Sequence, residues 1–147
     1  MNRRSLARLL LTALLASAAI SSFVLDWRGN HLLNPAWHPH AQFHGALLLF
    51  FLAGVCAISI WLLWRRSAEP EVALRVAALV SACFWTPFFY VPLLLPGSTL
   101  WAGSPGHMPR VAGFSFYPNV ATAGLFLMLT AVAYWLARTG EQELGGA

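Results

Sequence analysis

Charge is scarce in this sequence of 147 residues, and one charged residue type is missing altogether. Only 10% of the residues are charged, and none of them is a lysine. Hydrophobic residues make up 59% of the chain. A soluble domain of this length could not bury so many, because its surface is too large relative to its volume. The composition therefore excludes an ordinary soluble domain and favours an integral membrane protein.

Cysteine is almost absent, with Cys56 and Cys83 as the two examples. Both fall near the middle of long apolar runs, where a thiol usually behaves as a small apolar side chain. Because neither is presented to an oxidising compartment at that depth, the sequence gives no sign of a disulfide framework. A redox pair between neighbouring helices stays open, since the two residues could lie at similar depth.

Four apolar runs dominate the chain, and each has the length of a membrane-spanning helix. They cover about residues 6–25, 45–64, 72–95 and 119–136, and about 20 helical residues cross the hydrocarbon core of a bilayer. The connections between them are too short for a separate soluble domain. We therefore expect one four-span domain covering residues 1–147, an all-α integral membrane protein folded as an antiparallel four-helix bundle.

The first apolar run has a second interpretation. Arginines precede it, and Ala16, Ser17 and Ala18 resemble the cleavage site of a signal peptide. However, the run continues through Leu25 before it reaches Asp26, which is long for a signal peptide and suits a membrane span. We therefore expect the first span to be retained.

If the four spans cross the membrane one after another, starting with the N-terminus inside, the arginines are distributed unevenly between the two sides. Only Arg28 and Arg110 fall on the outer side. Because arginine favours the cytoplasmic side of membrane proteins, we expect a multi-pass protein of the inner (plasma) membrane with both termini cytoplasmic. The net charge of +4 then reflects topology and contacts with membrane lipids, so nucleic acid is excluded as a partner. The cytoplasmic arginines are Arg3, Arg4, Arg8, Arg65, Arg66, Arg75 and Arg138.

Prolines interrupt the outer half of the third run, at Pro87, Pro92 and Pro96. A proline inside a helix frees a backbone carbonyl and bends the axis, and in lipid the freed group needs a new partner. We expect this helix to be kinked or unwound at its outer end. Either the kink opens the bundle on that side, or it is an ordinary bend with aromatic rings facing lipid.

All five histidines fall in the two outer connections, and none lies inside an apolar run. The first outer connection carries His31, His38, His40 and His44, and the second carries His107. Histidine is the side chain whose charge changes most readily near neutral pH. A cluster of such groups at one face of an apolar protein is where chemistry is expected.

A metal site is one interpretation of the first outer connection. Pro39 is placed to begin the second helix, so His40 and His44 become neighbours four positions apart on one face. Asp26, the sole acidic side chain on that side, ends the first helix, with His31 shortly after it. Asp26, His31, His40 and His44 are therefore the expected ligands of a transition metal ion, zinc, copper or iron.

Acid–base chemistry is the competing interpretation, and it uses Asp26, His31 and His107 as catalytic residues. Asp26 would orient a histidine that moves a proton on a lipophilic substrate entering from the bilayer. A third interpretation is purely structural, with histidines bonding to water, headgroups and backbone carbonyls. His38 takes part in none of these sets, because Pro39 separates it from the helical pair.

A non-catalytic role also stays open at this point. The chain would then be an accessory or scaffold subunit whose aromatic face docks the helices of a membrane protein partner, or of a second copy in a homo-oligomer. Small residues such as Gly54 and Gly124 would allow helices to approach closely, within the chain or between chains. Transport is not favoured, since no span has an ionisable residue at mid-depth.

The first outer connection resembles two known patterns. The spacing Asp-x4-His-x12-His is similar in layout to the metal-ligand run of the small integral subunit of copper membrane monooxygenases, but it differs by one residue in the first gap and implies no activity here. The stretch also resembles small four-span membrane proteins of bacteria and fungi, which implies the four-span fold and no particular reaction. The matching residues are Asp26, Trp27, His31, Asn34, Pro35, Trp37, His40, Phe43 and His44.

Overall fold

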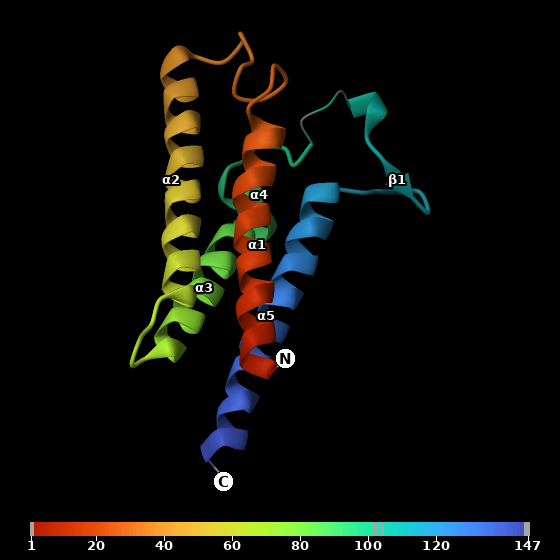
Figure 1. Ribbon diagram of the computed structural model, residues 1–147. Coiled ribbons are helices and arrows are strands. Elements are labelled where there is room, and N and C mark those ends of the chain that lie inside the picture. The colour runs from red at the N-terminus through yellow and green to blue at the C-terminus, as the bar shows by residue number, and fades with distance from the viewer. Residues whose placement is uncertain (1, 102, 104, 146–147) are drawn as a thin grey trace.

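The computed structural model describes residues 2–101, 103 and 105–145, and helices make up most of that part (Figure 1). Four segments in it are long and apolar enough to cross a membrane. The third of them is divided into two helices. The second outer connection, residues 95–117 (called the second connection below), holds one 3₁₀ turn and a short hairpin. The elements are α1 (Arg3–Asp26), α2 (Pro39–Trp64), α3 (Pro70–Trp85), α4 (Pro87–Leu94), η1 (Pro105–His107), β1 (Arg110–Val111), β2 (Phe114–Ser115) and α5 (Pro118–Gly145).

The helices begin where local sequence signals place them. The side chain of Asn2 caps α1 by accepting a hydrogen bond from the Ser5 amide at 2.8 Å. Helices α2, α3 and α5 each begin with a proline, at Pro39, Pro70 and Pro118. Proline suits the first turn because the amide it lacks would have no partner there. The four expected spans are therefore confirmed as helices, and each helix extends beyond its apolar run at one end or both.

Helices α1 and α3 form the centre of the fold: α1 contacts α2, α3 and α5, and α3 contacts α1, α2 and α5. Consecutive long helices run in opposite directions (Figure 1). The contacts are made mainly by alanine and leucine, whose small or flexible side chains let helices approach closely. The largest buried cluster contains Ala7, Leu11, Leu15, Cys56, Leu63, Leu74, Ala77, Ala78, Ala133 and Ala137.

Two side-chain hydrogen bonds join neighbouring helices, one in the apolar interior and one at the surface. The hydroxyl groups of Ser81 on α3 and Thr130 on α5 lie 2.7 Å apart and are buried. The indole of Trp64 on α2 donates to the Thr12 hydroxyl on α1 at 2.9 Å. The Ser81–Thr130 contact pairs two polar groups that would otherwise be buried without a partner. Cys56 and Cys83 are free thiols, so no disulfide joins the helices.

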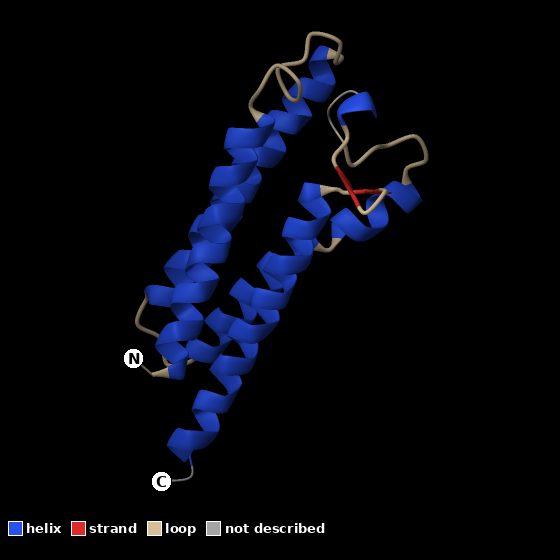
Figure 2. Cartoon of the chain, turned by 90° about the vertical axis from the view of Figure 1, so that its right-hand side faces the viewer, coloured by secondary structure: helices blue, strands red, loops and turns tan. Residues whose placement is uncertain are grey.

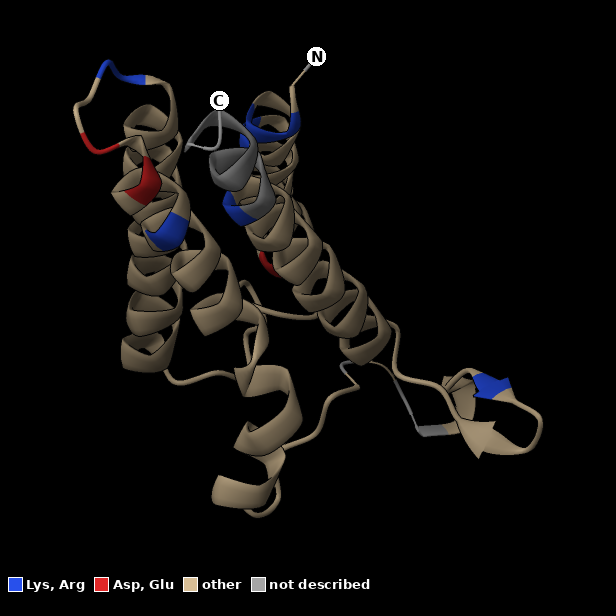
Figure 3. Cartoon of the chain, turned by 90° about the horizontal axis from the view of Figure 1, so that it is seen from below, with Lys and Arg blue, Asp and Glu red and all other residues tan. Residues whose placement is uncertain are grey.

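Most of the arginine positions lie toward the end of the structure where α1 begins (Figure 3), and the histidines lie in the connections at the other end. This arginine end comprises the start of α1, the connection between α2 and α3, and the Arg138 region of α5. Glu71 pairs there with Arg4 at 3.6 Å and with Arg75 at 3.7 Å. The separation of the two residue types expected from the sequence is therefore present in the fold. We call the opposite end, which carries Asp26 and His40, the histidine end.

The third apolar segment breaks at Thr86, between α3 and α4. Pro87 has no amide to donate to the Cys83 carbonyl, four positions earlier, so the regular bonding of the helix stops here. The amide and the hydroxyl of Thr86 both donate to the Ala82 carbonyl at 2.9 Å. The expected interruption of this helix is therefore confirmed. The β1–β2 hairpin lies beside the start of α5, and η1 lies farther out toward the histidine end (Figure 2).

The first connection, residues 27–38, rests on α2 at Gly45. A Cβ atom added there would lie 2.7 Å from the Leu32 side chain, which is 5% exposed. Real Cβ contacts are essentially never this short, so only glycine fits without displacement of Leu32. Gly54, on the same helix, has open space around its Cα.

This difference gives a matched pair of substitutions. Gly54→Ala is expected to be neutral or to stabilise by up to about 1 kcal/mol, through the helix preference of alanine. Gly45→Ala is expected to be less stable than Gly54→Ala by about 1 kcal/mol, because the Leu32 Cδ1 methyl must move to make room for the new Cβ. Thermal unfolding of both variants in one detergent measures the difference. Equal unfolding temperatures would show that the connection does not depend on this contact.

Candidate functional site

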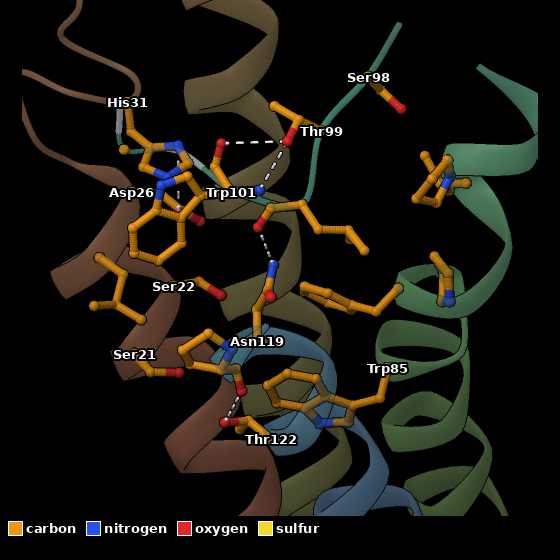
Figure 4. A pocket seen from close by; sticks show the side chains of 18 of the residues that line it. Ser21, Ser22, Asp26, His31, Trp85, Ser98, Thr99, Trp101, Asn119 and Thr122 are labelled. Carbon is orange, nitrogen blue, oxygen red and sulfur yellow. Dashed lines mark hydrogen bonds and ion pairs between the residues drawn. The ribbon is translucent and has the colours of Figure 1, made fainter. Parts of the chain in front are cut away.

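A cavity of about 740 Å³ lies at the histidine end, between α1, the α3–α4 break and α5 (Figure 4). Its size falls in the range of small-molecule sites, about 300 to 1,000 Å³. Most of its wall is apolar, and a small number of polar groups line the rest. The lining residues are Ser21, Ser22, Leu25, Asp26, Arg28, Asn30, His31, Phe84, Trp85, Pro87, Phe88, Val91, Pro92, Ser98, Thr99, Leu100, Trp101, Gly103, Pro118, Asn119 and Thr122.

Asp26 and His31 form a carboxylate–imidazole pair on the cavity wall. His31 Nδ1 lies 4.0 Å from Asp26 Oδ1, and their side chains are 38% and 40% exposed. This separation exceeds a direct hydrogen bond, but pairs that act together are often long before a ligand is bound. Because Nδ1 faces the carboxylate, Nε2 of the same ring is left for a ligand. The sequence predicted these two residues, and the fold brings them together.

The backbone of the first connection fixes His31 beside Asp26. The Asp26 carbonyl accepts hydrogen bonds from the amides of Arg28 and Leu32, at 2.8 and 3.0 Å. The chain therefore folds back over the end of α1. Arg28 does not pair with Asp26, because its Nε donates to the Val24 carbonyl at 2.6 Å. The Asp26 carboxylate is thus available to His31 and to the cavity.

A second set of bonds ties the same connection to α2. The Gln42 side-chain amide donates to the Asn34 carbonyl at 3.0 Å. The Asn34 side chain accepts from the Ala36 amide at 2.9 Å, which closes a tight turn. These contacts give Asn34 and Gln42 a structural role. They hold the segment that carries His31 against the helix that begins at Pro39.

Aromatic rings form the apolar wall opposite the Asp26–His31 pair. Trp85 is 5% exposed, and its ring centroid lies 4.8 Å from that of Phe126 and 5.5 Å from that of Phe88. Figure 4 shows Asp26, His31 and Trp101 toward one end of the cavity and Trp85 toward the other. The Trp85 indole nitrogen is buried and has no hydrogen-bond acceptor within the described part of the chain. The cavity therefore has a polar end and an aromatic end.

Several residues of the cavity were not predicted as site residues. Asn119 lies between the two ends in Figure 4, and its amide donates to the Leu100 carbonyl at 2.8 Å. This bond holds the second connection against the start of α5. Ser22, Thr99 and Trp101 also line the cavity. Among these residues, only Asn119 could have been recognised from the sequence, because it is a polar residue directly after the proline that begins a span.

His40 and His44 form a second pair, on the first turns of α2. Their Nε2 atoms lie 3.0 Å apart, and both side chains are exposed. The predicted i, i+4 arrangement after Pro39 is therefore confirmed. Neither residue lines the cavity that contains Asp26 and His31.

The remaining histidines lie apart from both pairs. His38 caps α2, where its Nδ1 accepts a hydrogen bond from the His40 amide at 3.2 Å. His107 ends η1, is exposed and does not line the cavity. Within the described residues, no three His, Cys, Asp or Glu side chains are grouped closely enough to hold a metal ion. The set of Asp26, His31, His40 and His44 is thus laid out as two pairs, and metal binding by all four stays a prediction.

These features define a class of protein: a chain with four helices of membrane-spanning length and a partly polar cavity at one end. The chain belongs to the family of unknown function DUF6640, whose sequence profile matches residues 10–140. The match covers nearly the whole chain and includes every candidate site residue. Comparison with curated proteins and with solved structures gives no match.

Proposed function

We propose that this protein is a four-helix membrane bundle that binds a lipophilic small molecule at its histidine end and transfers a proton to or from it. The observation that carries the proposal is the cavity of about 740 Å³ with the Asp26–His31 pair on its wall. An apolar pocket with a few convergent polar groups is the usual form of a small-molecule site. The ligand would place its apolar body against the aromatic end and its polar group near His31.

The proton would pass through His31. Its Nε2 lone pair accepts a proton from the ligand, whose bonding electrons stay on the ligand. The Asp26 carboxylate stabilises the imidazolium through Nδ1, as carboxylates do beside catalytic histidines. Return of the proton to the ligand restores the neutral ring. Proton transfer is therefore the reaction class, and it requires no other reactant.

The distribution of arginine supports the orientation of the bundle. The arginine end would face the cytoplasm of a cell with an inner (plasma) membrane, because arginine favours that side. Both termini would lie there, and the cavity would open on the outer side. Much of the surface between the ends is apolar, with Leu48 65% exposed and Phe51 67% exposed on α2. Such side chains suit contact with lipid tails.

Filling the cavity gives the direct test. Ser22 lines it and is 8% exposed, so the ring of a Ser22→Phe variant would occupy the ligand space. We expect wild-type protein purified in detergent to retain a lipophile with a polar group, and Ser22→Phe to retain at least about tenfold less. Mass spectrometry of solvent extracts measures both. Leu48→Phe, on the exposed face of α2, is the control and should match wild type.

An equal yield of lipophile from Ser22→Phe and wild type would contradict the proposal. It would favour the alternative role, an accessory subunit of a membrane complex. Such a subunit would have the cavity covered or filled by side chains of a partner, and its retained lipids would not depend on Ser22.

A further inference from the structure

The first turns of α2 carry two exposed imidazoles whose spacing suits a metal ion. Because Pro39 begins the helix, His40 and His44 project from the same face. Their Nε2 atoms lie 3.0 Å apart and their ring planes meet at 84°. Two imidazole nitrogens bound to one ion at about 2.0–2.1 Å lie about 2.8 to 3.4 Å apart when the N–metal–N angle is between about 90° and about 109°. The observed separation falls within this range.

We propose that His40 and His44 bind one divalent transition-metal ion per chain, at a site separate from the cavity. Imidazole suits copper, zinc and nickel, and copper(II) is bound most tightly by a given nitrogen site. Within the described residues, no third His, Cys, Asp or Glu group joins the pair. Water would therefore complete the coordination of the ion.

Binding needs no change in the number of protons on the two rings. In the metal-free pair, one Nε2–H donates to the Nε2 lone pair of the other ring. When the ion binds, the donor ring carries its proton on Nδ1 instead, and both Nε2 lone pairs face the metal. Both imidazoles remain neutral, which is the form that ligates metals.

The surroundings of the pair favour this geometry. The Phe43 ring stacks on His40 with centroids 6.3 Å apart, and it meets His44 edge-on at 5.5 Å. These contacts restrict the rotation of both imidazoles. His38 is occupied by its bond to the His40 amide, so it does not compete for the same ion. The site therefore has two ligands held on one helix.

Calorimetric titration of the full chain with copper(II) and zinc(II) chloride tests the site. The protein is purified in detergent with a tag that contains no histidine. We expect saturation at one ion per chain, with affinity at least about tenfold lower in His40→Ala and in His44→Ala. Circular dichroism shows whether each variant keeps its helices. His107→Ala is the matched control, since it removes one exposed histidine outside the pair.

The double variant Asp26→Asn/His31→Ala separates this site from a four-ligand site. It is expected to bind both metals as wild type does, because neither residue touches the pair. Weaker binding in that double variant would overturn the proposal in favour of ligation by all four residues. Absence of saturable binding in wild type, or equal binding in the two histidine variants, would also overturn it. None of these outcomes depends on the lipophile in the cavity.

Discussion

Conversion of the cavity-bound lipophile is expected to fall by about 10²- to 10⁴-fold when His31 is replaced by glutamine, while the lipophile itself stays bound. A positioned acid or base contributes about this much to a reaction. Glutamine can still form hydrogen bonds from the same place, but it cannot carry a proton. Single-turnover conversion of the extracted lipophile, added back to purified protein, measures the effect.

A companion substitution at Asp26 tests the same pair from its other side. Asp26→Asn keeps the shape of the side chain but removes the charge that stabilises the imidazolium. We expect a fall in conversion with little change in retained lipophile. If His31→Gln converts the lipophile as fast as wild type, His31 is a structural hydrogen-bonding residue and the acid–base role is wrong.

The aromatic end of the cavity gives the second large effect, on stability. Trp85→Ala removes a side chain that is 5% exposed and in contact with Phe84, Phe88 and Phe126. In lipid the lost contacts and the space left behind dominate the cost, at about 24 cal/mol per Å³ of added cavity. We expect about 2 to 3 kcal/mol of lost stability, measured by thermal or denaturant unfolding in detergent.

Two control variants isolate the cause of that loss. Trp85→Phe keeps a ring against Phe126 and removes the unpaired indole N–H, so its loss should be well below that of Trp85→Ala. Trp61→Ala removes an indole that is 61% exposed and has the Arg65 guanidinium over its ring, a contact worth about 0.5 to 1 kcal/mol. A Trp85→Ala variant no less stable than Trp61→Ala would show that the aromatic wall does not hold α3 to α5.

Local signals in the sequence predicted the helices well. The length of each apolar run, and Pro39 at the start of the second helix, were sufficient, because these signals act within a single helix. The pairing of His40 with His44 followed for the same reason, since four positions on one helix fix their separation. The break at Pro87 was also visible, because proline removes a backbone donor wherever it stands.

The cavity was not visible in the same way. It depends on how the first connection folds over Asp26 and how Asn119 holds the second connection, and both depend on contacts between distant segments. Apolar periodicity does not show which connection residues face inward. For this reason Ser22 and Asn119 were missed, and His107 was grouped with residues that it does not join in the cavity.

The division of the third apolar segment bears on the rate at which a ligand could enter and leave. Helix α4 contacts α3 and α5, and it makes no contact with α1 or α2. It also supplies Pro87, Phe88, Val91 and Pro92 to the cavity wall. Segments with few packed neighbours open at lower free-energy cost than the elements around them. Exchange with lipid should therefore follow the motion of this one short helix and leave the four long helices in place.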